Sequence, residues 1–208
     1  MKMTQTIKLS AVSILAIGVG CFIPMSAWAL PGQSMSQAMK FAASRPLWRG
    51  YKIGRDKETR SDQTLSKPFQ GGELRFAIYP SSITRPLSSR SKSESLEIRA
   101  VRSRLDFVRD EGKGLALIRQ AFGDRVAQDF AASRYTDKIM NPFYKTPELF
   151  YKGKRYGYVV GQNSYSPYYD GDSNVERFTI YSLSTWKKVR NGSRYCSTRP
   201  HERQCAPI

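Results

Sequence analysis

The segment LFYKGKRYGYVV, at positions 149–160, has the pattern of a β-hairpin. Its first three residues and its last five are mostly aromatic or β-branched, which favours strands. A short polar turn at Lys152-Gly153 separates the two runs. This part of the chain is therefore predicted to lie in an antiparallel sheet.

Two further strands are predicted on either side of this hairpin. In residues 175–183, Phe178 and Ile180 would share one face of the sheet and the residues between them the other. Residues 74–79 alternate in the same way and stop at Pro80. We expect Trp186, just after the last strand, to cover an edge of the core.

Helical patterns occur in two places. Ser34-Met35-Ser36-Gln37 has the form of a capping box and predicts a short helix that ends before Arg45-Pro46. A longer amphipathic stripe is formed by Leu115, Ile118, Phe122, Val126 and Phe130. Gly123-Asp124, inside that stripe, is suited to end one helix and cap the next.

Together these patterns predict an α+β fold, a single domain over residues 30–208 in which an antiparallel sheet packs against two or three helices. Residues 49–72 and 81–95 are mostly polar and are expected to be mobile loops.

Residues 96–110 fit two structures. A helical stripe is formed by Ile98, Val101, Leu105 and Val108. Leu96, Ile98 and Ala100 alternate as they would in a strand. We favour the helix slightly and leave the strand open.

Residues 1–29 predict a cleaved secretory signal peptide. Two lysines precede an apolar run at residues 9–23, and Ala27-Trp28-Ala29 offers small residues at the positions that a signal peptidase reads. The apolar run has about 15 residues, short of the roughly 20 that span a bilayer. An uncleaved anchor and lipid attachment at Cys21 are the weaker alternatives. The protein is therefore expected to be exported, to a periplasmic or extracellular location.

The chain is strongly basic, with 34 Lys and Arg against 17 Asp and Glu, a net charge of +17. Such a charge favours an anionic partner, which the composition leaves open as an acidic protein, anionic lipid head groups or an acidic glycan. No specific nucleic-acid-binding signature is present. The anion-binding candidates lie in two basic stretches and are Arg99, Arg102, Arg104, Lys187, Lys188 and Arg190. No transmembrane helix is expected after the signal.

Residues 162–174 contain no aliphatic side chain and are expected to form an exposed loop. Its recognition candidates are Tyr165, Tyr168, Tyr169, Asp170 and Asp172. The alternate acids resemble the start of a calcium loop, but Val175 stands where such a loop needs glycine. No metal site and no cofactor are predicted.

Cys196 and Cys205 are the two cysteines that follow the signal, and in an exported protein we predict that they form a disulfide. The bridge would close a loop of about ten residues and contribute roughly 2.5 kcal/mol. His201, the single histidine, would lie inside that loop.

The sequence as a whole favours an exported, basic, non-enzymatic accessory or binding protein that recognises an anionic partner or surface of the cell envelope. One alternative is a small secreted hydrolase, a nuclease or a glycan-directed enzyme, that uses His201 or the pair Asp170 and Asp172. Another is a structural subunit of an envelope protein complex. No catalytic residue is assigned.

Overall fold

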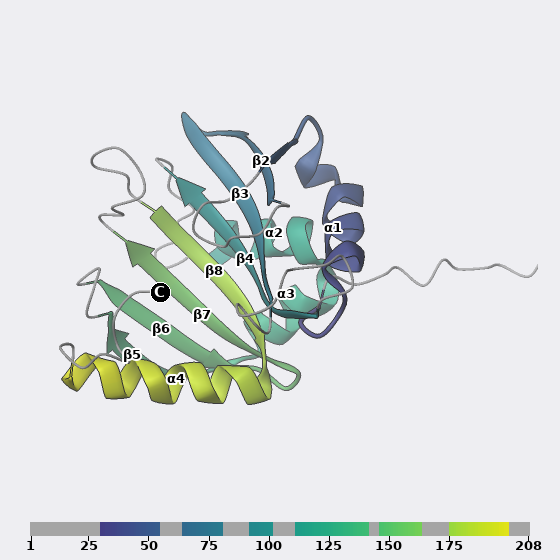
Figure 1. Cartoon of the computed structure of the whole chain (residues 1–208). Coiled ribbons are helices and arrows are strands. Elements are labelled where there is room, and N and C mark those ends of the chain that lie inside the picture. Colours follow the sequence, from purple (N-terminus) through teal and green to yellow (C-terminus); the bar gives the residue numbers. More distant parts are fainter. Residues whose placement is uncertain are drawn as a thin grey trace, which may run out of the picture.

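The structure, a computed structural model, describes residues 30–54, 64–80, 92–101, 111–141, 146–163 and 175–199 (Figure 1). The helices of this part are α1 (Met35–Ser44), the short 3-10 helix η1 (Pro46–Trp48), α2 (Glu111–Phe122), α3 (Asp124–Ala131) and α4 (Leu183–Thr198). The strands are β1 (Lys52–Gly54), β2 (Thr64–Phe69), β3 (Gly72–Pro80), β4 (Ser93–Val101), β5 (Arg134–Met140), β6 (Pro147–Lys152), β7 (Tyr156–Asn163) and β8 (Val175–Ser182).

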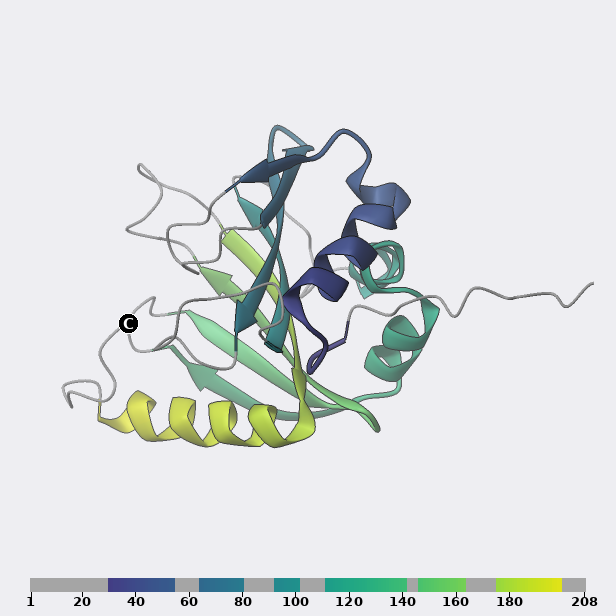
Figure 2. The same cartoon turned by 45° about the vertical axis from the view of Figure 1, so that its right-hand side comes forward.

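All of the strands in the described residues join one antiparallel sheet in the order β1-β2-β3-β4-β8-β7-β6-β5. The pairing of β4 with β8 joins strands β1–β4 to strands β5–β8 in one sheet. Figure 2 shows the twist that turns β5 and β6 away from the direction of β3. The structure thus confirms the predicted α+β domain, an antiparallel sheet with helices packed against it.

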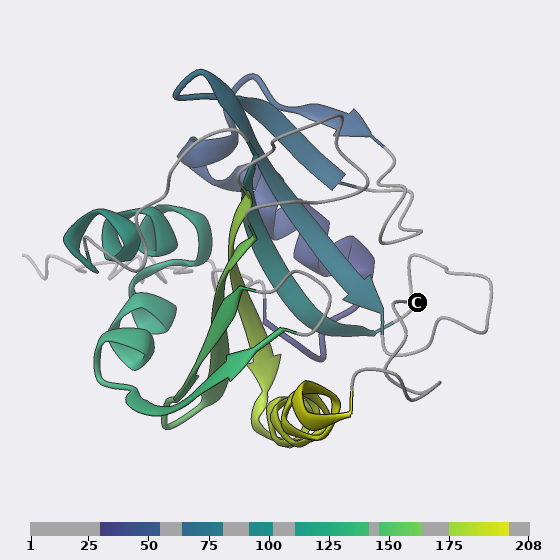
Figure 3. The ribbon, with the colours of Figure 1, turned by 90° about the vertical axis from the view of Figure 1, so that its left-hand side faces the viewer.

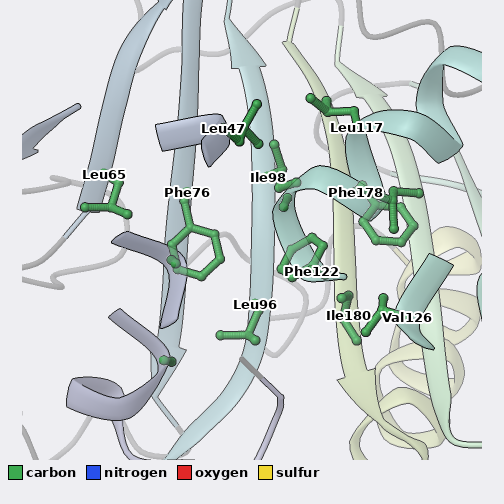
Figure 4. Packing of buried hydrophobic residues seen from close by; sticks show 14 of the residues in the cluster. Leu47, Leu65, Phe76, Leu96, Ile98, Leu117, Phe122, Val126, Phe178 and Ile180 are labelled. Atoms are coloured by element: carbon green, nitrogen blue, oxygen red, sulfur yellow. The ribbon is translucent and has the colours of Figure 1, made fainter. Parts of the chain in front are cut away.

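One face of the sheet carries the main core. Phe76, Ile98 and Phe178, from three neighbouring strands, are fully buried and face α2 and α3 (Figure 4). The ring of Phe122 lies 6.0 Å from that of Phe76 and 6.1 Å from that of Phe178 between ring centroids. Residues of α1 and η1 complete this layer beside β3. Figure 3 shows α4 on the other side of the strands from α2 and α3.

The predicted capping box and the break between two helices at Gly123 are confirmed, but Asp124 is the first residue of α3, and Gly123 occupies its cap position without a side-chain hydrogen bond. The Ser34 Oγ accepts a hydrogen bond from the Gln37 N–H at 3.2 Å, and the Gln37 side chain accepts one from the Ser34 N–H at 3.1 Å, which is a complete capping box. Gly123 separates α2 from α3 with a φ of 89°, a conformation that glycine adopts without strain. The predicted strand over residues 74–79 and the predicted hairpin at 149–160 are present. The strand predicted over residues 175–183 is present as far as Ser182, and Leu183 begins α4. Trp186 is buried, at 3% exposure.

Three expectations were wrong in part. Residues 96–101, for which a helix was favoured, belong to β4, and the expected loops give way to β2 at residues 64–69 and to the start of β4 at residues 93–95. Leu65, inside one expected loop, is fully buried. Helix α4 was not predicted. Along β4, Leu96, Ile98 and Ala100 alternate with Glu97 and Arg99, as the strand alternative required. The helical spacing that continues from Ile98 to Val108 in the sequence was misleading.

Candidate anion-binding surface

Helix α4 is attached to the sheet through Trp186. The indole Nε1 donates a hydrogen bond to the Tyr158 carbonyl oxygen at 3.2 Å, and the ring packs with Ile139, Phe150 and Val159 in a second small core. Gly157 leaves the space for this ring, because a Cβ there would lie 2.0 Å from the Trp186 Cγ. The helix therefore has a fixed position across β5–β8, and its basic residues are fixed with it.

Two arginines of α4 are used in holding the helix to β5. Arg190 forms an ion pair with Asp137 at 3.4 Å, and Arg194 pairs with the same carboxylate. The guanidinium carbon of Arg190 also lies 5.0 Å from the centre of the Trp186 ring. Because the Asp137 side chain is only 10% exposed, it needs these cations, and Arg190 has a structural role.

Three more arginines lie at paired positions on the sheet face that α4 covers, opposite the main core. Arg75, Arg99 and Arg177 are direct neighbours across β3, β4 and β8, an arrangement we call the arginine row. Like charges at opposed positions repel, so the row needs counter-charges. Each arginine has one, and the ion pairs are Arg75–Glu73, Arg99–Glu97 and Arg177–Glu148.

The centre of the arginine row is a buried polar network. Glu97 is 3% exposed and accepts hydrogen bonds from the Tyr79 hydroxyl at 3.1 Å and the Thr179 hydroxyl at 2.8 Å, besides its pair with Arg99. Arg99 itself is 8% exposed. These groups are paired and hydrogen-bonded, as buried charges must be, and the network stabilises the sheet rather than presenting free charge.

Arg177 reaches Glu148 by passing over β7. Burial alone would lower the pKa of Arg177, but the Glu148 and Glu97 carboxylates raise it, so the guanidinium stays charged. Gly161 lies between the two partners in the sheet, and a Cβ there would stand 2.8 Å from the Arg177 Nε. Glycine at this position leaves the space through which Arg177 reaches Glu148, and a larger residue would require the arginine to shift.

The turn between β6 and β7 is held by one carboxylate. Asp129, on α3, accepts hydrogen bonds from the backbone N–H groups of Lys154 and Arg155, both at 3.1 Å, and of Tyr156 at 3.3 Å. It also accepts one from the Tyr158 hydroxyl at 2.7 Å. The backbone that carries Lys154 and Arg155 is therefore fixed while their side chains stay exposed.

Exposed basic side chains gather at this end of the sheet. They form a group that we call the basic end, and its members are Arg134, Lys152, Lys154, Arg155, Lys187 and Lys188. The sheet register brings them together, because Arg134 is opposite Lys152 and the start of β7 is opposite Ser182, where α4 begins. None of these side chains forms an ion pair within the described residues.

The predicted anion-binding residues are thus divided by the structure. Lys187 and Lys188 are exposed members of the basic end, whereas Arg99 and Arg190 are tied to acids. Several other predictions lie outside the described residues and concern the signal at 1–29, Arg102, Arg104, the recognition candidates Tyr165, Tyr168, Tyr169, Asp170 and Asp172, and His201. Cys196 lies near the end of α4, but Cys205 is outside the described residues, so the disulfide stays a prediction.

The sequence did not point to Asp129 or Asp137, the two acids that fix the surroundings of the basic end. Their importance depends on contacts between residues far apart in the chain. The four basic-end members on β5, β6 and the β6–β7 turn were equally missed. Three of them stand together in the run Lys152-Gly153-Lys154-Arg155, in which only the turn was recognised. Ser182, which caps α4 through the Thr185 N–H at 3.2 Å, was the local signal that could have revealed this helix.

Other classes of site find no support in the described residues. No cluster of three or more His, Cys, Asp or Glu suited to a metal ion occurs among them. In the same residues, no helix combines the length and apolar character that crossing a membrane requires. The chain matches no protein-family model, no curated protein and no solved structure.

Proposed function

We propose that this chain is an exported, non-enzymatic binding protein whose basic end recognises an anionic partner or surface. The observation that carries the proposal is the grouping of exposed cations at one end of the sheet, apart from the cations that pair with acids. The arginine row and the arginines of α4 are paired with acids, while the exposed cations of the basic end have no acid partner in the described residues. Unpaired cations grouped on a rigid support attract polyanions and release counterions on binding.

The basic end suits this role because its supports do not depend on its charges. Asp129 holds the turn, and Trp186 together with the Arg190–Asp137 pair holds α4. The backbone under these lysines and arginines is held in place, while their side chains are exposed. They can therefore contact an extended anion without a change in the fold. An acidic protein, anionic lipid head groups and an acidic glycan all have the required charge.

A pair of charge-matched variants tests the proposal. One replaces Lys152, Lys154, Lys187 and Lys188 of the basic end with Gln. The control replaces Lys40, Arg49, Lys52 and Lys92 with Gln; these are also exposed, but they lie on or beside α1, β1 and the start of β4. Both variants lose the same charge, so any difference in their binding reports position rather than net charge.

Binding of each protein to polyglutamate, alginate and anionic phosphatidylglycerol vesicles is measured as a function of salt. We expect the basic-end variant to bind its preferred polyanion about tenfold more weakly at about 50 mM NaCl and to show a shallower salt dependence. The control should change by no more than about twofold on the same scale. Equal losses in the two variants would mean that net charge alone drives binding, and the proposal would fail.

A further inference from the structure

We propose that β5 is a docking edge, and that its occupant is an extended, acidic segment of a partner protein that adds to the sheet as one more strand. This inference rests on the proposed function and narrows the anionic partner to a polypeptide. Strand addition supplies affinity through main-chain hydrogen bonds, and side chains on either face supply specificity.

The outer edge of β5 has backbone groups available for pairing. β5 ends the strand order of the sheet, and no described strand lies beyond it. The Asn141 N–H donates to the Thr146 carbonyl oxygen at 2.9 Å, so the backbone of Asn141 faces β6. Because these groups alternate along an antiparallel strand, the N–H and C=O of Met140 and Lys138 point away from β6.

The side chains along this edge combine apolar surface with positive charge. Tyr135 and Met140 are 50% and 53% exposed and are the large hydrophobic residues that the described surface exposes most. Arg134 and Lys138, on the same strand, are exposed cations. Beside the other face of β5, the Arg194 side chain is 55% exposed at the end of α4.

An added strand would direct its side chains alternately toward these two sets. On one face they would meet Tyr135, Lys138 and Met140, and on the other the exposed part of Arg194. Acidic residues would find Lys138, and apolar residues would find Tyr135 and Met140. Complementary charge therefore selects an acidic segment.

A second copy of this chain fits the edge poorly. Self-pairing would bring Arg134 and Lys138 of one chain close to those of the other, and each chain has a net charge of +17. An exposed lysine on an edge strand also opposes pairing with a like strand. At the opposite end of the sheet, β1 has only three residues and offers a shorter edge.

The test uses two synthetic peptides of about eight residues, a length typical of strands, in which Glu alternates with Thr. The second peptide is N-methylated at every residue, which removes the main-chain donors of both of its edges and leaves its charge unchanged. Affinities for the native protein are measured by calorimetry at about 50 mM NaCl. We expect the parent peptide to bind at least about tenfold more tightly than the N-methylated one.

A matched pair of protein variants tests the same edge by changing β5 instead of the peptide. Lys138→Pro removes the outward N–H without removing a bond to β6, since proline is tolerated at such edge positions. Lys138→Thr removes the same charge and keeps the N–H. Strand addition predicts that Lys138→Pro binds the parent peptide at least about fivefold more weakly than Lys138→Thr. If Lys138→Pro does not fold, as circular dichroism would show, the two peptides decide the question with the native protein.

Equal affinity for the two peptides, or no binding of either, would overturn strand addition. The proposed function fails on a different result, namely equal losses of polyanion binding in the basic-end variant and its charge-matched control. The two ideas can therefore fail separately.

Discussion

The arginine row and the basic end have charges of the same sign but differ in how those charges are compensated. Arg99 and Arg177 are largely buried and each has a glutamate partner, which makes them parts of the sheet. Lys187 and Lys188 are exposed and have no acid partner among the described residues. A strongly basic sequence thus contains two kinds of cation, and the structure rather than the net charge separates them. Removing charges from the two regions should have opposite consequences for stability and for binding.

The largest effect on stability is expected at the centre of the arginine row. Glu97→Ala would leave Arg99 buried without its carboxylate and should lower the free energy of unfolding by about 3–5 kcal/mol. Glu73→Ala breaks the 2.8 Å ion pair with Arg75, in which the Glu73 side chain is 34% and the Arg75 side chain 26% exposed. It should lower the free energy of unfolding by only about 0–1 kcal/mol. Urea denaturation at neutral pH measures both. Equal losses would mean that burial does not set the strength of these pairs.

The support of the basic end should respond to packing. In Gly157→Ala the new methyl group would overlap the Trp186 ring, and we expect a loss of about 1–3 kcal/mol in the free energy of unfolding. Gly192→Ala is the control, because Gly192 lies in α4 with nothing within 4 Å of its added Cβ. It should stabilise the helix by about 0.5–1 kcal/mol. A loss at Gly192 equal to that at Gly157 would contradict the packing explanation.

Alkaline pH should lower the free energy of unfolding, because two tyrosines resist ionisation in the folded chain. Burial, followed by the hydrogen bond to Asp129, raises the pKa of Tyr158 above that of a free tyrosine, and burial also raises the pKa of Tyr181. Above pH about 10 these tyrosines ionise in the unfolded chain but not in the folded one, so stability is present below that pH and is lost as the pH rises. Each tyrosine that stays neutral in the folded chain should lower the free energy of unfolding by about 1.4 kcal/mol for each pH unit above about 10.

Tyr158→Phe provides the control for this pH dependence. It removes one ionisable group, so the decrease in unfolding free energy above pH about 10 should be shallower by about 1.4 kcal/mol per unit. The variant should also be less stable at neutral pH, since Asp129 loses the 2.7 Å hydrogen bond. An unchanged slope would show that Tyr158 titrates alike in the folded and unfolded states.

The smallest effect on stability is expected at the basic end itself. Replacing Lys152, Lys154, Lys187 and Lys188 with Gln should change the free energy of unfolding by no more than about 0.5 kcal/mol at each position. The same changes should have the largest effect on polyanion binding. A decrease of several kcal/mol in the free energy of unfolding would mean that these lysines stabilise the fold, as the arginine row does.

The sequence was most informative where neighbours in the chain determine the structure. The capping box at Ser34 and the turn at Lys152-Gly153 are local signals, and both were read correctly. β4 was missed because Ile98 and Val101 also fit a helical stripe, and the pairing with β3 and β8 that makes this segment a strand involves residues far apart in the chain. β2 was missed because it includes Lys67 and Pro68, residues more typical of loops.

The candidate site could be predicted only in part for the same reason. Lys187 and Lys188 stood out as basic residues next to each other. Nothing in the sequence separated them from Arg190, which pairs with Asp137 on a strand more than forty residues earlier. Arg99 likewise looked like a surface cation until its contacts with Glu97 and Tyr79 were known. Pairing across the sheet, which depends on the fold, decides which cations are free.

Lysine footprinting of the native protein tests the central claim most directly. The purified protein is acetylated with sulfo-N-hydroxysuccinimidyl acetate, in the presence and in the absence of polyglutamate. The extent of modification of each lysine is then measured by mass spectrometry. The account predicts that polyglutamate protects Lys152, Lys154, Lys187 and Lys188 while the reactivity of Lys40, Lys52 and Lys92 is unchanged. Uniform protection of both groups, or protection of the second alone, would contradict it.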